Sequence, residues 1–574
     1  MFKPIGDWLD ARAGHREIVD KMLNEPIPGG SRWMFVTGSG LVFAFVLQVL
    51  TGIFLAMYFS PSATDAWASV WYIENKVTFG GIVRGLHHFG SSAMIVLCVI
   101  HMAQVFVYGA HKNPRELNWV VGVLMMFIVL GFALTGYLLP WDQKGYWATK
   151  VATGIMGTVP ILGRMIQTLA QGGSDYGNLT LTRFYALHAF VLPGALIGLL
   201  TVHLYLFRRH GVTPSPRATE AQLKHVEMFW PAQLFKDTVY MMLVLAVLLC
   251  LTLFVGAPLD QPADPTASYE ARPEWYFLFL FQILKYFEGP MAVIGTVVIP
   301  TAAAVFLLAL PFIDRWKSNT LWARAPWMVL FFGFLAFPVA LTGIAIYEDR
   351  ANAQFQEALE EEEAQTEQAL AMAEGGGIDD KGKIILYEGY HLFEEKGCVG
   401  CHAIEGRPQP EKKGGPNLTG YLSREWFHDF FVEPTSEKYF GGIEAGGEKK
   451  WAMPTAQKMR IKEDADIWAL AEMMVNQTGL DYEPPVDPKK VERGLGVYNG
   501  AICSICHSLE REAVDGPALA RYGSESWLKA FIRWPDAPHH FGARNAMPAG
   551  DNLSDDELRY LAAYLQSLRV SDQP

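Results

Sequence analysis

Two copies of the pattern C-x-x-C-H stand in the last third of this 574-residue sequence. In such a pattern the two cysteines attach a haem covalently and the histidine binds its iron. A zinc site would require four nitrogen or sulfur ligands, and each motif supplies only three. The motifs therefore predict two c-type haems, held by Cys398, Cys401, His402, Cys503, Cys506 and His507.

The two motifs open two copies of one longer repeat. In both copies a proline is followed ten residues later by a tryptophan, and then by a Met-Pro pair. An amphipathic stretch closes each copy, at 464–475 and at 554–568. We expect two helical domains, one after the other.

The methionine of each Met-Pro pair is the expected distal iron ligand. These residues are Met453 and Met547. A thioether opposite a histidine raises the reduction potential, which suits an electron acceptor. His539 and His540 are alternative ligands in the second copy.

Four further histidines lie inside long apolar segments, where ionisable groups are costly and usually functional. His87 and His101 are 14 residues apart, which is about 3.9 helical turns and about 21 Å. His188 and His203 are 15 residues apart, or about 4.2 turns. Each pair lies near one face of its helix. The pattern predicts two haem b groups, one between His87 and His188 on the outer side and one between His101 and His203 on the inner side, with His88 left over.

Glycines repeat the 14-residue spacing in two other apolar segments, as Gly38 with Gly52 and Gly122 with Gly136. Missing side chains at these depths would let a flat macrocycle approach the backbone, and close helix packing is the alternative explanation. Arg84 and Arg183 begin the two histidine-bearing segments, where they are candidates to pair with haem propionates.

Seven apolar stretches position these residues, each long enough for the roughly 20 residues that a membrane span needs. They cover 34–58, 82–108, 117–140, 184–207, 236–256, 291–313 and 326–347. Charged residues make up 18% of the chain and concentrate after residue 347. The net charge of −12 argues against nucleic acid as a partner, because such a partner requires a basic surface. The expected fold is all-α, with a seven-helix transmembrane bundle followed by two small helical cytochrome c domains.

Lysine and arginine concentrate in three loops that share one side of the expected bundle. These loops contain Lys112 and Arg115; Arg208, Arg209, Arg217, Lys224 and Lys236; and Arg315, Lys317 and Arg324. The positive-inside rule places them and the N-terminus in the cytoplasm, so seven crossings put the haem c domains outside. The first 33 residues lack the apolar core of a cleavable signal peptide. The acidic segment 349–374 is expected to be an exposed helix that serves as a solvated spacer or a docking surface for a basic partner.

From about residue 20 to 347 the chain resembles cytochrome b of the Rieske/cytochrome b family. The resemblance is carried by the histidine pairs and by LQVLTG at 47–52, LPWDQKGYW at 139–147 and PEWY at 273–276. The 15-residue histidine spacing and the segment 139–147 are similar to the b6 branch. That branch has its b6 part and a three-helix subunit IV as separate chains, and here the two resemble a fusion.

The resemblance implies two quinone sites. The outer site would oxidise quinol, with Glu274 accepting a quinol proton and rotating toward the outer haem to release it. Its implied residues are Pro273, Glu274, Trp275, Tyr276 and Tyr137. For an inner quinone site the implied residues are Arg208, His210 and Asp237.

The chain departs from the family in two respects. The cysteine that holds an extra inner-side haem in the b6 branch is replaced by Ala44, which removes the ground for expecting that haem. The tandem haem domains are expected to replace the separate c-type cytochrome of family complexes. The Rieske ligand pattern C-x-H…C-x-x-H is absent from the sequence, so a separate iron–sulfur protein is expected as partner.

These observations predict a quinol:cytochrome c oxidoreductase subunit with two haem b and two haem c groups. Electrons from quinol would pass through the b haems to the inner quinone site. They would also pass, through the Rieske protein, to the c haems and a periplasmic cytochrome c or terminal oxidase, in a proton-translocating Q cycle. The alternative is a membrane b-haem anchor for a periplasmic reductase without a Q cycle. The PEWY motif favours the first, because an anchor needs no quinol-oxidation loop. A homodimeric complex in a bacterial inner membrane is implied.

The predicted domain limits follow this division of roles. They are 1–33 for a cytoplasmic N-terminal segment, 34–215 for a b6-like haem b domain, 216–348 for a subunit IV-like domain, 349–377 for the acidic linker, 378–482 for the first cytochrome c domain and 483–574 for the second.

Overall fold

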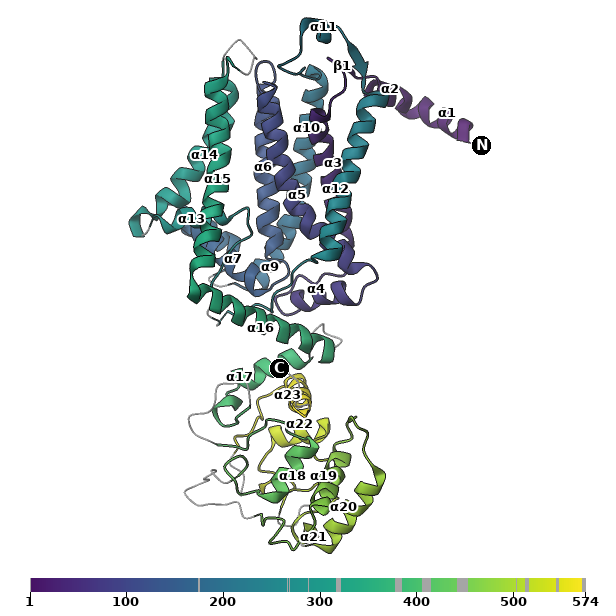
Figure 1. The fold of residues 1–574 in the computed structure, drawn as a ribbon, viewed down its shortest axis with the longest axis vertical. Helices are drawn as coiled ribbons and strands as arrows, with labels where there is room; N and C mark the ends of the chain where they lie inside the picture. Colours follow the sequence, from purple (N-terminus) through teal and green to yellow (C-terminus); the bar gives the residue numbers. More distant parts are fainter. Residues whose placement is uncertain are drawn as a thin grey trace. The chain divides into compact units, whose positions relative to one another are not determined.

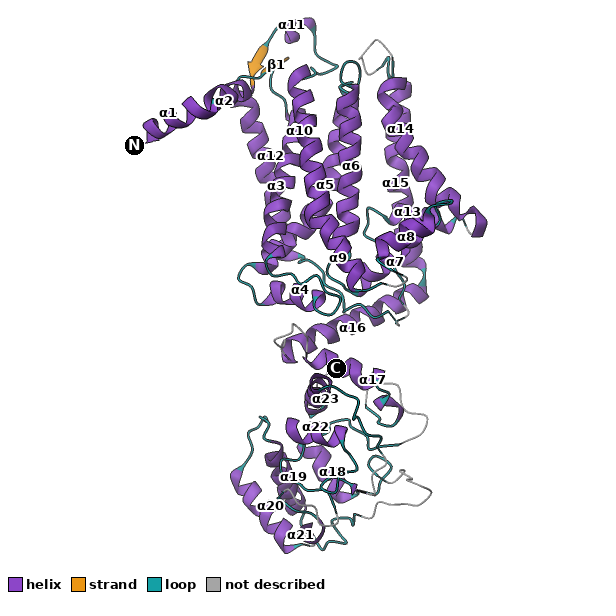
Figure 2. Ribbon diagram, turned by 180° about the vertical axis from the view of Figure 1, so that it is seen from behind, coloured by secondary structure: helices purple, strands orange, loops and turns teal. Residues whose placement is uncertain are grey.

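A computed structural model describes most of the chain. The described residues are 2–173, 176–265, 267, 269–287, 289–315, 322–376, 385–404, 414–440, 453–501, 503–510, 516–542 and 547–569. They divide into two compact units, Met1–Thr366 and Glu367–Pro574. Across the described residues the fold is mainly helical, as expected (Figure 2).

The first unit contains seven helices long and apolar enough to cross a membrane, which confirms the predicted number (Figure 1). They are Trp33–Ala56 (η1 and α3), Gly80–Val107 (α5), Glu116–Tyr137 (α6), Asn178–His210 (α9, η2 and α10), Phe229–Phe254 (η3 and α12), Ile294–Ile313 (η5 and α14) and Ala325–Ala351 (α15). Only 11–33% of each apolar window is buried within the chain. The rest requires an apolar surrounding such as lipid or other subunits.

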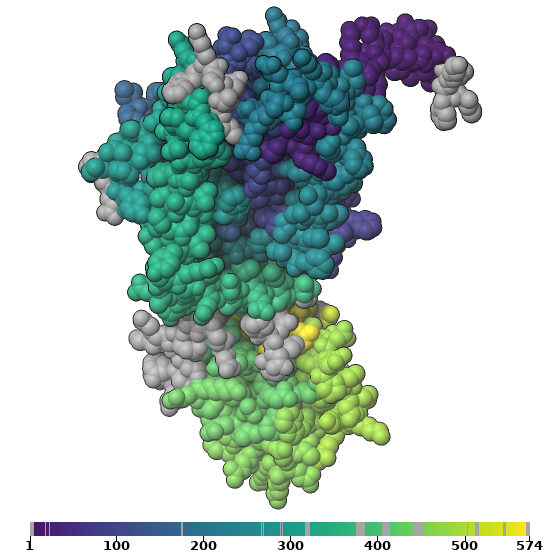
Figure 3. Space-filling view, turned by 45° about the horizontal axis from the view of Figure 1, so that its top comes forward, coloured from purple at the N-terminus to yellow at the C-terminus, as the bar shows by residue number. Residues whose placement is uncertain are grey.

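Shorter helices lie around these spans. They are α1 (Phe2–Ala13), α2 (His15–Leu23), α4 (Ala66–Asn75), α7 (Gln143–Gly157), α8 (Gly163–Gln171), α11 (Glu220–Leu223), α13 (Leu278–Lys285), η4 (Gly289–Met291) and α16 (Ala353–Gly376). Helices α1 and α2, in purple, stand away from the packed spans (Figure 3).

One end of the bundle carries the basic loops. The ends of α5, α10 and α14 that lead into these loops lie at the upper end of Figure 1, and Lys317 falls outside the described residues. At this end strand β1 (Pro26–Pro28) pairs antiparallel with β2 (Val226–Met228), with Ile27 opposite Glu227. This pairing ties the N-terminal segment to the start of α12.

A π-helical turn interrupts the fourth span. It covers Leu187–Val191 between α9 and α10 and includes His188. A π turn inserts one extra residue into an α-helix. The 15-residue spacing from His188 to His203 therefore fits the same number of turns as the 14-residue spacing from His87 to His101, which the sequence pattern alone did not show.

The acidic segment after the last span is helical and largely exposed, as expected. Helix α15 continues to Ala351, and α16 begins after Asn352, whose side chain accepts a hydrogen bond from the Phe355 amide. Thr366 donates to Asp260 (2.9 Å), and Gln261 donates to Gln365 (2.7 Å). These bonds attach one face of α16 to the loop after α12.

The second unit contains both C-x-x-C-H repeats around one continuous apolar core, which extends from Leu392 to Leu565. Its helices are α17 (Ile385–Glu395), η6 (Cys398–Gly400), α18 (Arg424–Val432), α19 (Asp464–Thr478), α20 (Pro488–Gly500), α21 (Cys503–Cys506), α22 (Glu525–Arg533) and α23 (Asp555–Ser567). The two repeats follow one another in the chain and share this core.

The two repeats exchange their terminal helices. Helix α17 begins the first repeat but packs on α23 of the second, where Gly389 lies so close to Tyr560 that an added Cβ would be 2.1 Å from its carbonyl oxygen. Helix α20 begins the second repeat but packs on α19 of the first, where a Cβ on Gly494 would be 2.2 Å from the Ala469 oxygen. Each repeat thus supplies a helix that completes the other.

Candidate functional site

The structure brings the four membrane histidines together in the predicted pairs. The ring centres of His87 and His188 are 6.2 Å apart, and those of His101 and His203 are 6.4 Å apart. With metal–nitrogen bonds of about 2 Å and about 1.1 Å from nitrogen to ring centre, two imidazoles on opposite sides of one metal ion have centres about 6.3 Å apart. Both pairs therefore fit a bis-histidine iron.

Hydrogen bonds at Nδ1 orient all four rings, three of them through a threonine. Thr51 Oγ1 lies 2.9 Å from His87 Nδ1 and itself donates to the Leu47 carbonyl, so it accepts the Nδ1 proton. Thr135 Oγ1 lies 3.2 Å from His188 Nδ1 and donates to the Gly131 carbonyl, so it accepts the Nδ1 proton of His188. A proton on Nδ1 leaves the Nε2 lone pair for a metal ion.

The inner pair has analogous partners. Thr37 Oγ1 lies 3.1 Å from His101 Nδ1, and the Asn118 carbonyl lies 3.1 Å from His203 Nδ1. The sequence analysis did not predict the three threonines that bind histidine rings. The pattern that could have identified them is the dipeptide Thr-Gly, which occurs at 37–38, 51–52 and 135–136.

The four predicted glycines lie against the histidine rings. An added Cβ would be 3.3 Å from His101 at Gly38, 3.1 Å from His87 at Gly52, 3.5 Å from His203 at Gly122 and 2.5 Å from His188 at Gly136. The glycines therefore make room for the imidazoles of each pair, and the approach of a macrocycle to their backbone stays a prediction.

Gly136→Val is expected to remove the haem held at His87 and His188 while the inner pair keeps its own. The valine would displace the His188 ring, since even the Cβ would be 2.5 Å from Cε1. Haem b content of the purified chain, by pyridine haemochrome spectroscopy, should fall to about half. Gly198→Val on α10 is the control, because no atom lies within 4 Å of its added Cβ. Equal haem content in both variants would contradict the role of Gly136.

The two predicted propionate arginines are bound elsewhere in the structure. Arg84 is buried and contacts Glu74 and the carbonyls of Ala257 and Pro258. Arg183 donates to the Leu169 carbonyl at 2.6 Å. Arg84 thereby holds the segment after α12, and Arg183 holds the end of α8. Their pairing with propionates stays a prediction.

In the second unit the histidines of both motifs are oriented alike. His402 Nδ1 donates to the Pro416 carbonyl at 3.0 Å, and His507 Nδ1 donates to Pro517 at 2.9 Å. The Nε2 lone pairs are thus left for iron, as in metal-bound histidines generally. Gly415 and Gly516 make room for these rings, with added Cβ atoms at 2.3 and 2.5 Å from Cε1.

The expected distal methionines are half-buried against the same core. Met453 and Met547 both pack on it. The competing residue His540 is buried, and its Nδ1 donates to the Trp534 carbonyl at 3.0 Å. The same kind of bond orients the motif histidines, so it does not decide between His540 and Met547, and Met547 stays the predicted ligand.

The PEWY segment lies against α6 and against α5, which carries His87. Tyr276 is buried in a cluster with Met94 and Ala133, and burial together with the Glu274 charge raises its pKa. Trp275 donates to Ser92 at 3.4 Å. Lys144 Nζ lies 3.1 Å from Glu274 Oε1. Pro273 precedes Glu274 in the same loop.

Tyr137 is the second tyrosine of the predicted quinol site. Among the described residues its hydroxyl is buried without a hydrogen-bond partner. Such groups in native structures call for a ligand, water or functional explanation. The hydroxyl also lies within electrostatic range of Glu274. A polar ligand beside Glu274 would give this hydroxyl a partner.

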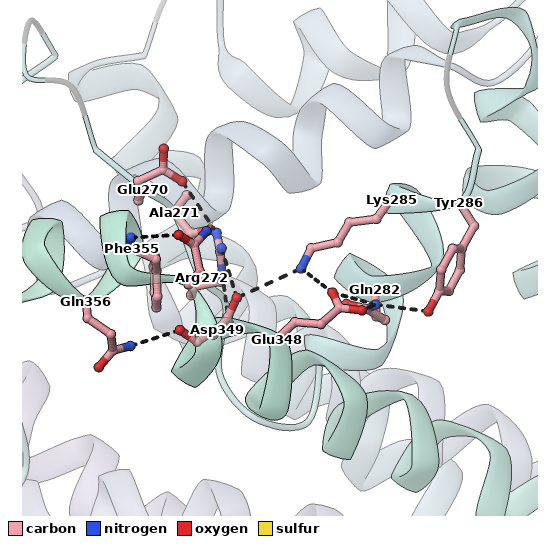
Figure 4. A network of polar contacts seen from close by, with 11 residues as sticks. Glu270, Ala271, Arg272, Gln282, Lys285, Tyr286, Glu348, Asp349, Phe355 and Gln356 are labelled. Atoms are coloured by element: carbon pink, nitrogen blue, oxygen red, sulfur yellow. Dashed lines mark hydrogen bonds and ion pairs between the residues drawn. The ribbon is translucent and has the colours of Figure 1, made fainter.

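An ion-pair network holds the loop that leads into PEWY (Figure 4). Arg272 forms two hydrogen bonds to Asp349 at the end of α15, of 2.9 and 3.0 Å, and its guanidinium lies 4.3 Å from the centre of the Phe355 ring. Lys285 bonds Glu348 at 3.1 Å. The network fixes Glu274 relative to the last span.

The three inner-site residues lie at the opposite end of the bundle, and each has a different partner. Arg208 pairs with Glu25 at 2.9 Å. The His210 carbonyl accepts from Arg115 at 2.8 Å. Asp237 is buried at the start of α12 and accepts from Gln233 at 2.8 Å.

Family models match four parts of the chain. Residues 22–211 match the family described as cytochrome b/b6/petB, and residues 262–354 match cytochrome b(C-terminal)/b6/petD. Residues 386–478 match cytochrome c, and residues 489–565 match subunit III of cbb3-type cytochrome c oxidase.

Individual proteins agree with these matches. A menaquinol:cytochrome c reductase cytochrome b subunit from Bacillus subtilis is 45% identical over 37% of this chain and 99% of its own length. A cytochrome bc complex cytochrome b subunit from Chlorobaculum thiosulfatiphilum is 36% identical over 56% of this chain and 72% of its own. A solved chain of a hyperthermophilic respiratory Complex III is similar with a TM-score of 0.53 and 30% identity, over 59% of this chain and 91% of that one.

Proposed function

Because the chain belongs to the cytochrome b/b6 family, we propose that it oxidises quinol at Glu274 on one side of the membrane and reduces quinone near Asp237 on the other. The protein is a multi-pass membrane protein, the cytochrome b and c subunit of a bc-type quinol:cytochrome c reductase. Its cytochrome b and c domains imply haem b and haem c. The same matches support the domain limits proposed from the sequence.

The proposal assigns two haem b and two haem c groups to named residues. His87 with His188 and His101 with His203 would hold the b haems. Their 6.2 and 6.4 Å separations and free Nε2 atoms support this. The c haems would be held by Cys398, Cys401, His402 and Met453, and by Cys503, Cys506, His507 and Met547. When bound, the four groups supply one-electron acceptors between which the two electrons of a quinol can be divided.

One observation carries the proposal: Glu274 lies within electrostatic range of His88, the neighbour of His87 in α5, and of Tyr137 and Tyr276. Its side chain is 17% exposed, so it lies between the bundle and solvent. A carboxylate in this position can accept the proton of a bound quinol hydroxyl and pass it outward. Tyr137, Trp275 and Tyr276 would form the wall of this site.

The complex requires partners that this chain does not supply. We propose a separate Rieske iron–sulfur protein, a periplasmic cytochrome c or terminal oxidase as acceptor, a homodimeric complex and a proton-translocating Q cycle. Three basic loops at one end support an inner membrane location with that end in the cytoplasm. Arg208 and His210 at this end would serve the inner quinone site with Asp237.

Glu274→Gln is expected to slow quinol oxidation by about 100-fold or more while both b haems remain, because glutamine keeps the shape but cannot accept a proton. Turnover with a soluble quinol and haem b content measured on the same preparation check this. Glu270→Gln, in the same loop and exposed, is the matched control. Wild-type turnover in Glu274→Gln would sink the assigned role.

A further inference from the structure

Lys144 belongs to the segment LPWDQKGYW at 139–147 and has no role in the proposed function so far. It contacts the proposed proton acceptor, Glu274, directly. Its Nζ lies 3.1 Å from Oε1 of Glu274, a residue 130 positions away in the chain. The lysine side chain is 36% exposed and that of Glu274 17% exposed. Lys144 therefore reaches the carboxylate from the solvent side of the site.

The backbone at Lys144 is firmly held. Asp142 caps α7 by accepting from the Gly145 amide at 2.8 Å, and the Gln143 amide donates to Gln261 at 2.9 Å. An added Cβ at Gly145 would be 2.4 Å from the Tyr137 carbonyl. Helix α7 is thus packed closely on the end of α6, and Lys144 approaches Glu274 from a fixed position.

The other groups within electrostatic range of Glu274 come from three elements. They are His88 from α5, Tyr137 from α6 and Tyr276 in the turn that follows Glu274. Burial and the Glu274 charge raise the pKa of Tyr276, so this phenol stays neutral. Lys144 brings a positive charge into contact with the carboxylate.

We propose that Lys144 is a positioning residue for quinol oxidation, which holds the Glu274 carboxylate turned toward α7 until quinol binds. This inference rests on the proposed role of Glu274. The quinol O–H bond breaks and its proton forms a new O–H bond on the Glu274 carboxylate. The neutral acid then loses its attraction to Lys144 and is free to rotate and release the proton to water.

The pH dependence of quinol oxidation tests this inference. A cation in contact with a carboxylate favours proton release from it, so the acidic limb of the rate profile should move to higher pH in Lys144→Met. The maximal rate of quinol oxidation at alkaline pH should stay the same in Lys144→Met as in the wild type. Lys144→Arg keeps the charge and should keep the wild-type profile. Lys150→Met is the matched control, because Lys150 lies on the same helix and packs over the Trp147 ring at 4.0 Å.

Infrared spectroscopy of the purified complex gives a second measurement that does not depend on turnover. The protonated-carboxyl band that is lost in Glu274→Gln should appear at higher pH in Lys144→Met than in the wild type. An unshifted band and profile, or a rate lowered equally at every pH, would overturn the role of Lys144 alone. Wild-type turnover in Glu274→Gln would instead overturn the proposed function, and the inference with it.

Discussion

Replacing Arg324 by methionine is expected to lower the free energy of unfolding of the membrane unit by about 3–5 kcal/mol, the range for removing one partner of a buried ion pair. Arg324 is 0% exposed and bonds Asp314 through Nη2 at 2.8 Å. Asp314 is equally buried and also contacts His111 at 3.1 Å and Lys112 at 3.2 Å. Without Arg324 the buried Asp314 carboxylate would lose its bonded guanidinium, and only His111 and Lys112 would offset the cost of burying its charge.

This cluster joins two parts of the bundle that the sequence predicts to be separate domains. His111 and Lys112 follow α5, whereas Asp314 and Arg324 flank the loop between α14 and α15. Arg324 also donates to the Phe106 carbonyl at 3.0 Å, and the Phe106 ring stacks on Phe331 at 4.0 Å. Its loss should therefore loosen the attachment of α14 and α15 to the haem b helices.

The stability loss should depend on pH in a defined direction. Burial raises the pKa of Asp314, but its contacts with His111, Arg324 and Lys112 outweigh this and hold the pKa at about 2. A lowered pKa contributes stability above the unfolded value of about 3.9, and this contribution is lost as the pH falls toward 2. Because Arg324→Met removes part of this contribution, the difference in stability from wild type should stay constant from pH 7 to about pH 5 and narrow as the pH falls from about 4 toward 2.

Denaturation of the detergent-solubilised protein, followed by b-haem absorbance, measures this loss. Arg315→Met is the matched control, because Arg315 is exposed in the same loop and donates only to the Phe312 carbonyl among the described contacts. Surface changes of this kind usually stay within about 0.5 kcal/mol. Equal stability of the two variants would refute the role of the cluster.

Tyr564→Ala, in the last helix of the chain, is expected to perturb the haem of the first C-x-x-C-H motif. Tyr564 is 4% exposed, and its ring centre lies 5.6 Å from that of Phe393 in α17. Phe393 in turn lies 6.4 Å from the His402 ring. Truncating a large buried aromatic residue costs about 3–5 kcal/mol, and here the cavity would open beside the first motif.

The same kind of substitution can be made where α19 packs on α20. Met473 in α19 occupies the position that corresponds to Tyr564 and packs on Gly494 of α20, which leads into the second motif. Met473→Ala should therefore perturb the second haem. Ion pairs reinforce both contacts, Lys396 with Glu557 at 3.1 Å and Arg493 with Asp466 at 2.7 Å.

Redox titration of the c-type absorbance would distinguish the two haems, with Cys398→Ala and Cys503→Ala variants to identify each signal. If the helices are exchanged, Tyr564→Ala shifts the midpoint potential of the haem at the first C-x-x-C-H motif. Met473→Ala then shifts the midpoint potential of the haem at the second motif. The reverse assignment would show that each repeat folds on its own helices, and would refute the exchange.

Much of the membrane part could be predicted from the sequence because its signals are local. The seven spans follow from uninterrupted apolar runs, and the structure has all seven within a few residues. The pairing of His87 with His188 followed from residue spacing alone, since helical periodicity places residues 14 apart on one face. The glycines were found by the same spacing, but their contact with the imidazole rings was not.

What the sequence by itself determined are the properties carried within single elements: the C-x-x-C-H motifs, the spacing of the histidines, the apolar spans and the PEWY turn. The tertiary structure alone decided which elements meet. Lys144 contacts Glu274 across 130 residues, Arg324 contacts Asp314 beside α5, and α17 packs on α23 of the other repeat. The physical reason is that periodicity and motif spacing encode one helix face at a time. Contacts between distant segments depend instead on how all the faces pack together, and repeats of similar sequence offer nearly equivalent partners.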